Sequence, residues 1–219
     1  MTIQITGYSI SPFCLVLFHV LKELGLSYEF TQPDSFEEIK SPEYLATKHP
    51  FGKIPSLNDD GFQIYETRAI ARYLLRDVRA HSVKLGTKTS TVLIPSDVQK
   101  AALVEQFISV EASHFTRTLS KLIVQLVFKK RYGKEPDLKI VNETREELDK
   151  TLDVYDKLVV DKDYLTGKFF LANLHIPYTF YAINIAGESE LWDKRPNVSD
   201  DGRTLVNANV GKILPLNIK

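Results

Sequence analysis

Residues 51–74 contain the polar groups whose types and spacing most strongly suggest a binding site. Ile54-Pro55 opens a short apolar run, where a proline cannot donate a ladder hydrogen bond and an X-Pro bond can be cis. A second run ends at Glu66-Thr67, and a helix with one apolar face follows. The unpaired amides at the start of that helix would attract a carboxylate. The same pattern also fits an ordinary ββα unit whose proline only forms a turn.

A second group of chemically useful side chains lies in the segment Ser11-Pro12-Phe13-Cys14. Pro12 suits the first position of a helix, and Ser11 suits the N-cap before it. The segment looks like the C-P-x-C redox motif with its first cysteine replaced by serine. The exposed nucleophilic position is then a hydroxyl, and Cys14 falls inside the helix, where we expect a small buried hydrophobic residue.

The elements that must position these groups follow the order βαβ, an irregular or helical segment, and then ββα, which is the order of a thioredoxin-like fold. Alternation, caps and turn residues predict the elements: strands at 3–6 and 28–31, a helix over 13–24, a short helix near 42–47, and a hairpin turn at 58–61.

The second half of the chain is predicted to be all-α. An apolar stripe over residues 101–126 steps by three or four residues, which is typical of a long amphipathic helix. Further helices are expected with residues 148, 152, 155 and 159 facing inward, and over 169–185, where Pro177 interrupts. The chain is therefore predicted to contain three parts: a thioredoxin-like domain at 1–80, a linker at 81–95 and an all-α domain at 96–219.

The composition is that of a soluble globular protein, with 43% hydrophobic and 26% charged residues. Lys and Arg together number 28, as do Asp and Glu, which gives no support for a nucleic-acid or membrane partner. One cysteine excludes an internal disulfide and fits a reducing compartment. Because neither a signal peptide nor a membrane-spanning run is apparent, we expect a cytoplasmic protein.

Several segments together resemble glutathione transferases, and the phi class in particular, whose loop reads NPFGxxP. They are ISPFC at 10–14, HPFGKIP at 49–55, YETRAIARYL at 65–74, LDVY at 152–155, YLTG at 164–167 and RPNV at 195–198. The resemblance covers roughly residues 2–198. It implies a homodimeric detoxification enzyme that conjugates glutathione, as co-substrate, to small hydrophobic electrophiles, with no other cofactor and no metal.

The resemblance implies how residues 54–67 would hold glutathione. The backbone of Ile54, presented by a cis Pro55, would pair with the cysteinyl part of the tripeptide. Glu66 and Thr67 would hold the γ-glutamyl end, with its carboxylate on the helix amides and the Thr67 hydroxyl and its ammonium near Glu66. Without the resemblance, these two residues are equally well interpreted as a helix cap.

Two lysines, Lys40 and Lys53, would reach the glycyl carboxylate. The family often has glutamine where Lys53 stands, and His-Lys where Lys40-Ser41 stands. Each lysine alone is also compatible with a solvated surface charge.

The resemblance assigns the thiolate to Ser11. A thiol with a pKa of about 8.5 must fall by about two units to ionise at pH 7, which requires roughly 3 kcal/mol. A hydrogen bond to a charged acceptor supplies about 1.5–3 kcal/mol, and a helix N-terminus about 0.3–1 kcal/mol. Two alternatives remain: Tyr8 stabilises the thiolate, as a tyrosine does in other classes, or Ser11 is only the N-cap.

Five residues are candidates for an electrophile pocket between the domains, although the same aromatic stripe also fits plain core: Ile10, Phe13, His114, Phe115 and Leu119.

Two departures from the family pattern are apparent. The Ser/Thr-x-x-Asp pair at the start of the buried helix is replaced by Phe170 and Asn173, and the residues after Val198 lack the usual aromatics. They permit an alternative function, a non-catalytic protein that binds glutathione or apolar ligands. A third hypothesis, thiol-disulfide or peroxide reduction, would depend on Cys14.

Overall fold

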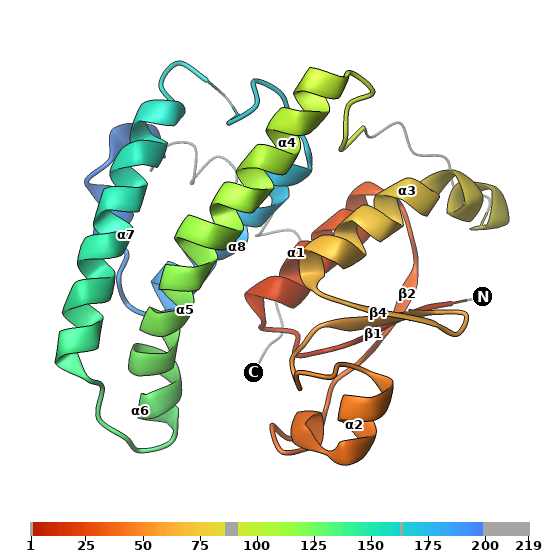
Figure 1. Ribbon diagram of the computed structural model, residues 1–219, viewed down its shortest axis with the longest axis horizontal. Helices are drawn as coiled ribbons and strands as arrows, with labels where there is room; N and C mark the ends of the chain where they lie inside the picture. The colour runs from red at the N-terminus through yellow and green to blue at the C-terminus, as the bar shows by residue number, and fades with distance from the viewer. Residues whose placement is uncertain (1, 86–91, 163, 199–219) are drawn as a thin grey trace. The chain divides into compact units, whose positions relative to one another are not determined.

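The computed structural model describes residues 2–85, 92–162 and 164–198, without the side chains of residues 77–85, 176–178 and 180 (Figure 1). The chain forms two compact units, Met1–Leu93 and Ile94–Lys219. The first unit contains a four-stranded sheet with helices, and the described part of the second is helical. The predicted fold class, a thioredoxin-like domain followed by an all-α domain, is confirmed.

The sheet has the strand order β2-β1-β3-β4, in which β1 and β2 are parallel and the other neighbours are antiparallel. Its strands are β1 (Ile3–Thr6), β2 (Tyr28–Thr31), β3 (Ser56–Asp59) and β4 (Phe62–Tyr65). In the centre, Ile5 lies opposite Phe30 on β2 and Leu57 on β3. Ile5 and Leu57 are fully buried, so the core of this unit is centred on β1 and β3.

Helices cover both faces of this sheet. They are α1 (Pro12–Glu23), η1 (Glu38–Lys40), α2 (Pro42–Thr47) and α3 (Thr67–Leu85). Figure 1 shows α1 and α3, which contact each other, on one side of the sheet and α2 on the other. Cys14 is buried as expected, and Phe13 is only half-buried. The apolar residues that follow at helical spacing are buried too: Val16, Leu17, Val20, Leu21 and Leu24. Phe13 is the second residue of α1, directly after the loop, and the first turn of a helix is less covered than its middle.

The hairpin and the helix after it show one agreement and one difference. Asp60 and Gly61 form the turn with φ of 54° and 93°, as expected for a two-residue hairpin whose central residues both need positive φ. In contrast, α3 continues to Leu85, so the first residues of the predicted linker at 81–95 are helical. No Gly or Pro stands between residues 76 and 85, so the helix continues beyond the end of the apolar stripe.

The second unit begins with a long helical run, as the stripe predicts. It passes through α4 (Val98–Val110), η2 (Glu111–Thr116), α5 (Arg117–Ile123), η3 (Val124–Phe128) and α6 (Lys129–Arg131). The stripe residues Val104, Ile108 and Leu122 are buried. Both η2 and η3 are π-helical, and such wider turns re-aim side chains within a helix. A regular spacing of three and four residues does not reveal them.

Three further helices complete the described part of this unit: α7 (Leu138–Leu158), α8 (Leu171–Ile185) and α9 (Glu190–Asp193). The inward side chains predicted for α7, including Leu148 and Leu152, are buried. The predicted interruption at Pro177 is wrong, because α8 runs through that position. Proline removes one backbone donor, but burial of the flanking Leu174 and Ile183 favours the continuous helix.

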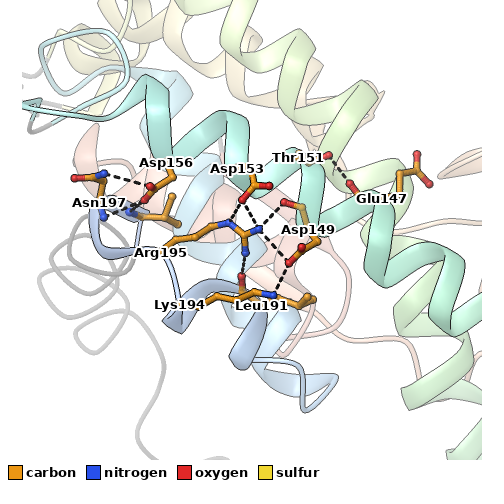
Figure 2. Close-up of polar contacts among 10 residues, drawn as sticks. Glu147, Asp149, Thr151, Asp153, Asp156, Leu191, Lys194, Arg195 and Asn197 are labelled. Carbon is orange, nitrogen blue, oxygen red and sulfur yellow. Dashed lines mark hydrogen bonds and ion pairs between the residues drawn. The ribbon is translucent and has the colours of Figure 1, made fainter.

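The RPNV segment at 195–198 is fastened to α7, as Figure 2 shows. The buried Arg195 donates to Asp153 Oδ1 from Nε (2.9 Å) and Nη2 (2.6 Å), to the Asp149 carbonyl (2.7 Å) and to the Leu191 carbonyl. The Asn197 N–H donates to the Asp156 carboxylate at 3.0 Å. The likeness noted at 152–155 and 195–198 therefore involves two segments that contact each other.

The start of α8 corrects the expectation that its cap is lost. Asn173 Oδ1 accepts the Phe170 backbone N–H at 3.0 Å, so asparagine supplies half of a capping box in place of the expected acid. Phe170 has no oxygen with which to return the bond, so the serine or threonine half is absent. The residues after Val198, on which the other departure falls, lie outside the described residues.

Among the described residues, no helix combines the length and apolar character needed to cross a bilayer.

Candidate functional site

The first turn of α1 and the segment before β3 approach each other at Gly7. The Ile54–Pro55 peptide bond is cis, as predicted. A Cβ on Gly7 would lie 2.4 Å from Cys14 Sγ and 3.7 Å from the Pro55 Cα, so only glycine leaves room here. Cys14 Sγ and Pro55 therefore both lie next to Gly7.

Ser11 occupies the N-cap of α1 with extended backbone angles, but its hydroxyl makes no hydrogen bond to the helix amides. Its side chain is half-buried. Burial raises the pKa of the Cys14 thiol to about 12, which outweighs the opposing effect of hydrogen bonds from the Ser11 hydroxyl and the Tyr8 backbone. Cys14 is fully buried, which agrees with the predicted unreactive thiol and opposes thiol-dependent reduction. The alternative residue, Tyr8, packs its ring against Phe36.

Glu66 and Thr67 lie at the junction of β4 and α3. Glu66 has a φ of 73°, a left-handed conformation that residues other than glycine rarely adopt and that tends to occur at functional sites. Its carbonyl accepts the Ile70 N–H, so the helix starts immediately after it. Thr67 is the first residue of α3 and is 5% exposed. The carboxylate of Glu66 is 58% exposed and can therefore meet a ligand.

Sequence reasoning gave no role to His49, which lies beside Glu66. His49 is 2% exposed, its Nδ1 accepts the Phe51 N–H at 3.3 Å, and its Nε2 lies 3.9 Å from Glu66 Oε1. Burial lowers the pKa of His49, and the nearby Glu66 carboxylate partly opposes this effect. The ring packs against Tyr65 with centroids 4.5 Å apart. The only available sequence signal was a histidine where the phi-class loop has asparagine.

The two predicted lysines behave differently. The Lys40 ammonium donates to the carbonyls of Phe51 (3.3 Å) and Gly52, so it holds the loop before the cis proline. The Lys53 side chain is exposed, and its backbone carbonyl accepts the Tyr44 hydroxyl at 2.9 Å. Both lysines therefore belong to the loop that carries Ile54, although Lys40 already uses part of its donor capacity within the protein.

The electrophile-pocket candidates belong to different units. Ile10, which is 45% exposed, and the half-buried Phe13 lie in the first unit. In the second, His114 is exposed, whereas Phe115 and Leu119 are buried at 3% and 5%. Phe115 packs edge-on against Tyr155 with ring centroids 5.6 Å apart, which is the packing expected of a core aromatic.

Within residues 2–85, 92–162 and 164–198, no group of three or more His, Cys, Asp or Glu residues is arranged to hold a metal ion. The polar groups of the candidate site instead suit an organic ligand with carboxylates and an ammonium group.

A βαβ-ββα unit with a cis proline before its third strand, followed by a helical unit, defines a thioredoxin-like protein with an all-α extension. Residues 3–76 match the family model described as "Glutathione S-transferase, N-terminal domain". The chain is 37% identical over 182 residues to glutathione S-transferase F10 of Arabidopsis thaliana, with 82% of this chain and 80% of that protein covered. It is 34% identical to a probable glutathione S-transferase, GSTF1, of Oryza sativa subsp. japonica, with 81% of this chain and 79% of that protein covered.

A solved structure agrees with these relatives. Glutathione S-transferase-I, bound with the ligand lactoylglutathione, has a TM-score of 0.81 and 28% identity, with 99% of this chain and 100% of that chain covered. The chain therefore belongs to the glutathione S-transferase family, and its relatives are of the plant phi class. It is an enzyme of that family, a glutathione transferase of the serine type.

Proposed function

We propose that the protein ionises the thiol of glutathione at Ser11 and transfers the sulfur to small hydrophobic electrophiles. Catalysis is favoured over a purely ligand-binding role because relatives over most of the chain are named as transferases. The similar transferase-I, moreover, is described as bound with the ligand lactoylglutathione.

The observation that carries the proposal is the state of Ser11. A serine at an N-cap ordinarily accepts a hydrogen bond from an amide of its own helix, and here that bond is absent. The Ser11 hydroxyl is instead hydrogen-bonded to the Cys14 thiol, and it would turn its O–H from that sulfur to the thiolate of a bound ligand, for which the start of α1 adds a favourable dipole. Together these two effects match the roughly 3 kcal/mol that a two-unit fall in thiol pKa requires.

The tripeptide would be held by the loop and the helix start that follow. β3 begins at Ser56, so the backbone of Ile54 precedes the paired residues and would align with the cysteinyl part of glutathione beside Pro55. The γ-glutamyl carboxylate would meet the first amides of α3 and the Thr67 hydroxyl, and its ammonium would meet Glu66.

Other parts of the proposal rest on the family rather than on a contact. Lys53 and the third donor of Lys40 would meet the glycyl carboxylate. Ile10, Phe13 and His114 would contact the electrophile, whereas the burial of Phe115 and Leu119 favours a core role for those two. The active form would be a homodimer in the cytoplasm, and light scattering of the purified protein would test its oligomeric state.

The decisive experiment compares Ser11→Ala with Ser9→Ala. Ser9 is a near neighbour whose hydroxyl lies 3.4 Å from Gln32 Oε1, so its loss should leave turnover unchanged. Ser11→Ala should lower kcat/KM about 100-fold at pH 7, the equivalent of about 3 kcal/mol, and leave glutathione affinity similar by calorimetry. Its rate should recover as pH rises past about 8.5, where glutathione ionises unaided.

Undiminished turnover of Ser11→Ala at pH 7 would contradict the assignment. A comparable loss in Tyr8→Phe, with Ser11→Ala active, would transfer the role to Tyr8.

A further inference from the structure

The proton position on His49 follows from its hydrogen bonds. Nδ1 accepts the Phe51 N–H, so the proton of the neutral imidazole lies on Nε2. The backbone of His49 is fixed, since its N–H donates to the Tyr44 carbonyl and its carbonyl accepts the Gly52 N–H, and the ring packs against Tyr65. The buried Nε2–H group therefore lies 3.9 Å, nitrogen to oxygen, from the carboxylate of Glu66.

Glu66 needs such a partner. Its side chain is 58% exposed, so packing restrains its rotamer only in part, and long exposed side chains lose rotamer entropy when a ligand orders them. Its left-handed backbone also directs the side chain along a path that is unusual for the start of a helix.

We propose that His49 is a positioning residue that orients the Glu66 carboxylate for the ammonium group of glutathione, as the neutral tautomer with its proton on Nε2. The inference rests on the proposed function, in which Glu66 receives that ammonium. His49 does not touch the substrate. It acts by reducing the freedom of Glu66 and by linking it to the loop at 49–55 that carries Ile54.

Protonation of His49 would weaken glutathione binding for two reasons. Nδ1 would become a donor and lose the Phe51 N–H, and the imidazolium would compete with the substrate ammonium for Glu66. The charged groups that face His49 are Glu66, which favours protonation, and Lys53 and Lys40, which oppose it together with burial. The KM for glutathione should therefore rise on acidification below the ordinary histidine range.

Two substitutions of His49 distinguish the role of its Nδ1 atom from the role of its Nε2 atom. Asparagine can accept the Phe51 N–H through Oδ1 but cannot extend to Glu66, whereas glutamine can place an amide N–H near the Nε2 position but lacks the Nδ1 acceptor. Each variant is assayed with glutathione and with glutaryl-Cys-Gly, which is glutathione without its α-ammonium. Glu43→Gln, an exposed carboxylate in the first turn of α2, serves as the control.

We expect His49→Asn to raise the KM for glutathione roughly 2- to 5-fold, the effect of a polar contact with a largely exposed carboxylate, with kcat at saturation unchanged and the KM for glutaryl-Cys-Gly unchanged. His49→Gln should retain more of the preference for the ammonium-bearing substrate. In both variants, the rise of the KM for glutathione at acidic pH should disappear. Since the two substrates are compared on one variant, partial unfolding affects both alike and leaves the ratio interpretable.

The outcomes separate the two proposals. If the wild type does not distinguish the two substrates, the role of Glu66 itself is wrong and the inference fails with it. If the wild type distinguishes them and Glu66→Gln abolishes the distinction, but His49→Asn keeps it in full, the assignment of His49 alone is wrong.

Discussion

Replacement of Arg195 tests the energetic importance of the contact between α7 and the RPNV segment. The Arg195 side chain is 6% exposed and donates to two carbonyls and to the Asp153 carboxylate, and its Nη2 also lies 3.0 Å from Asp149 Oδ1. In Arg195→Met a side chain of similar length keeps much of the apolar packing and removes all of these donors.

The magnitude depends on what the acceptors do afterwards. Removing one partner of a fully buried ion pair costs about 3–5 kcal/mol. Here, however, Asp149 and Asp153 are 38% and 59% exposed, and Asp149 keeps Lys194 at 2.8 Å, so both carboxylates can return to water. The remaining cost is the loss of the charge-assisted hydrogen bonds to the two carbonyls, which contribute at most about 1.5–3 kcal/mol each. We therefore expect a net loss of about 2–4 kcal/mol, which corresponds to a fall in Tm of roughly 5–15 °C for a chain of this size.

The measurement is urea and thermal unfolding of the full chain, followed by circular dichroism at one protein concentration, because association would make Tm depend on concentration. The matched control is Lys139→Met, whose ion pair with Glu143 joins side chains that are 84% and 66% exposed and should contribute little. Arg195→Lys should fall between the two, because lysine cannot reproduce the planar fork. If Arg195→Met loses no more stability than Lys139→Met, the cluster in Figure 2 is not a stabilising contact.

Two other predictions concern stability. Asn173→Ala should destabilise the protein by about 0.5–2 kcal/mol through loss of the hydrogen bond to the Phe170 N–H. The control Asn184→Ala, at an exposed position of the same helix, should change the midpoint of urea unfolding little. Equal midpoints for the two variants would refute the capping role. Burial, with a smaller effect from Lys22, lowers the pKa of His19 from 6.5 to about 4, so the unfolded chain binds a proton between these values while the folded chain does not. The contribution of neutral His19 to the free energy of unfolding should be complete above pH 6.5 and decrease by up to about 3 kcal/mol as pH falls toward 4. His19→Gln should make the free energy of unfolding, measured by urea unfolding, less dependent on pH over this range. An unchanged pH dependence would exclude His19 as its source.

The elements that sequence reasoning predicted well are those whose cause is local. The turn at Asp60-Gly61 depends on positive φ at adjacent residues, and Pro12 begins α1 because an N1 position needs no amide donor. The stripe over 101–126 predicted a long helix because burial follows the helical repeat. In each case a few neighbouring residues contain the physical cause, so the printed sequence is sufficient.

The features that were missed depend on contacts between distant positions. The link between His49 and Glu66 exists because the loop after α2 returns beside the junction of β4 and α3, and no periodicity records that path. Arg195 reaches α7 across more than forty positions. The capping role of Asn173 was discounted because asparagine was compared with the family's acid, although its amide oxygen accepts the same backbone N–H.

Ser11 stands where a C-P-x-C redox motif has its first cysteine, and this difference limits the chemistry available to the first unit. A C-P-x-C site needs an exposed attacking thiolate and a second thiol that can resolve the mixed disulfide. Here the remaining sulfur of Cys14 is fully buried, its pKa is raised to about 12, and it fills the space beside Gly7 that a Cβ would otherwise require. In the proposed function, Ser11 and the start of α1 would offer a sulfur substrate a hydrogen-bond donor and a helix dipole. Those two groups would stabilise a thiolate that arrives with a ligand, so glutathione, rather than the buried Cys14, would supply the reactive sulfur.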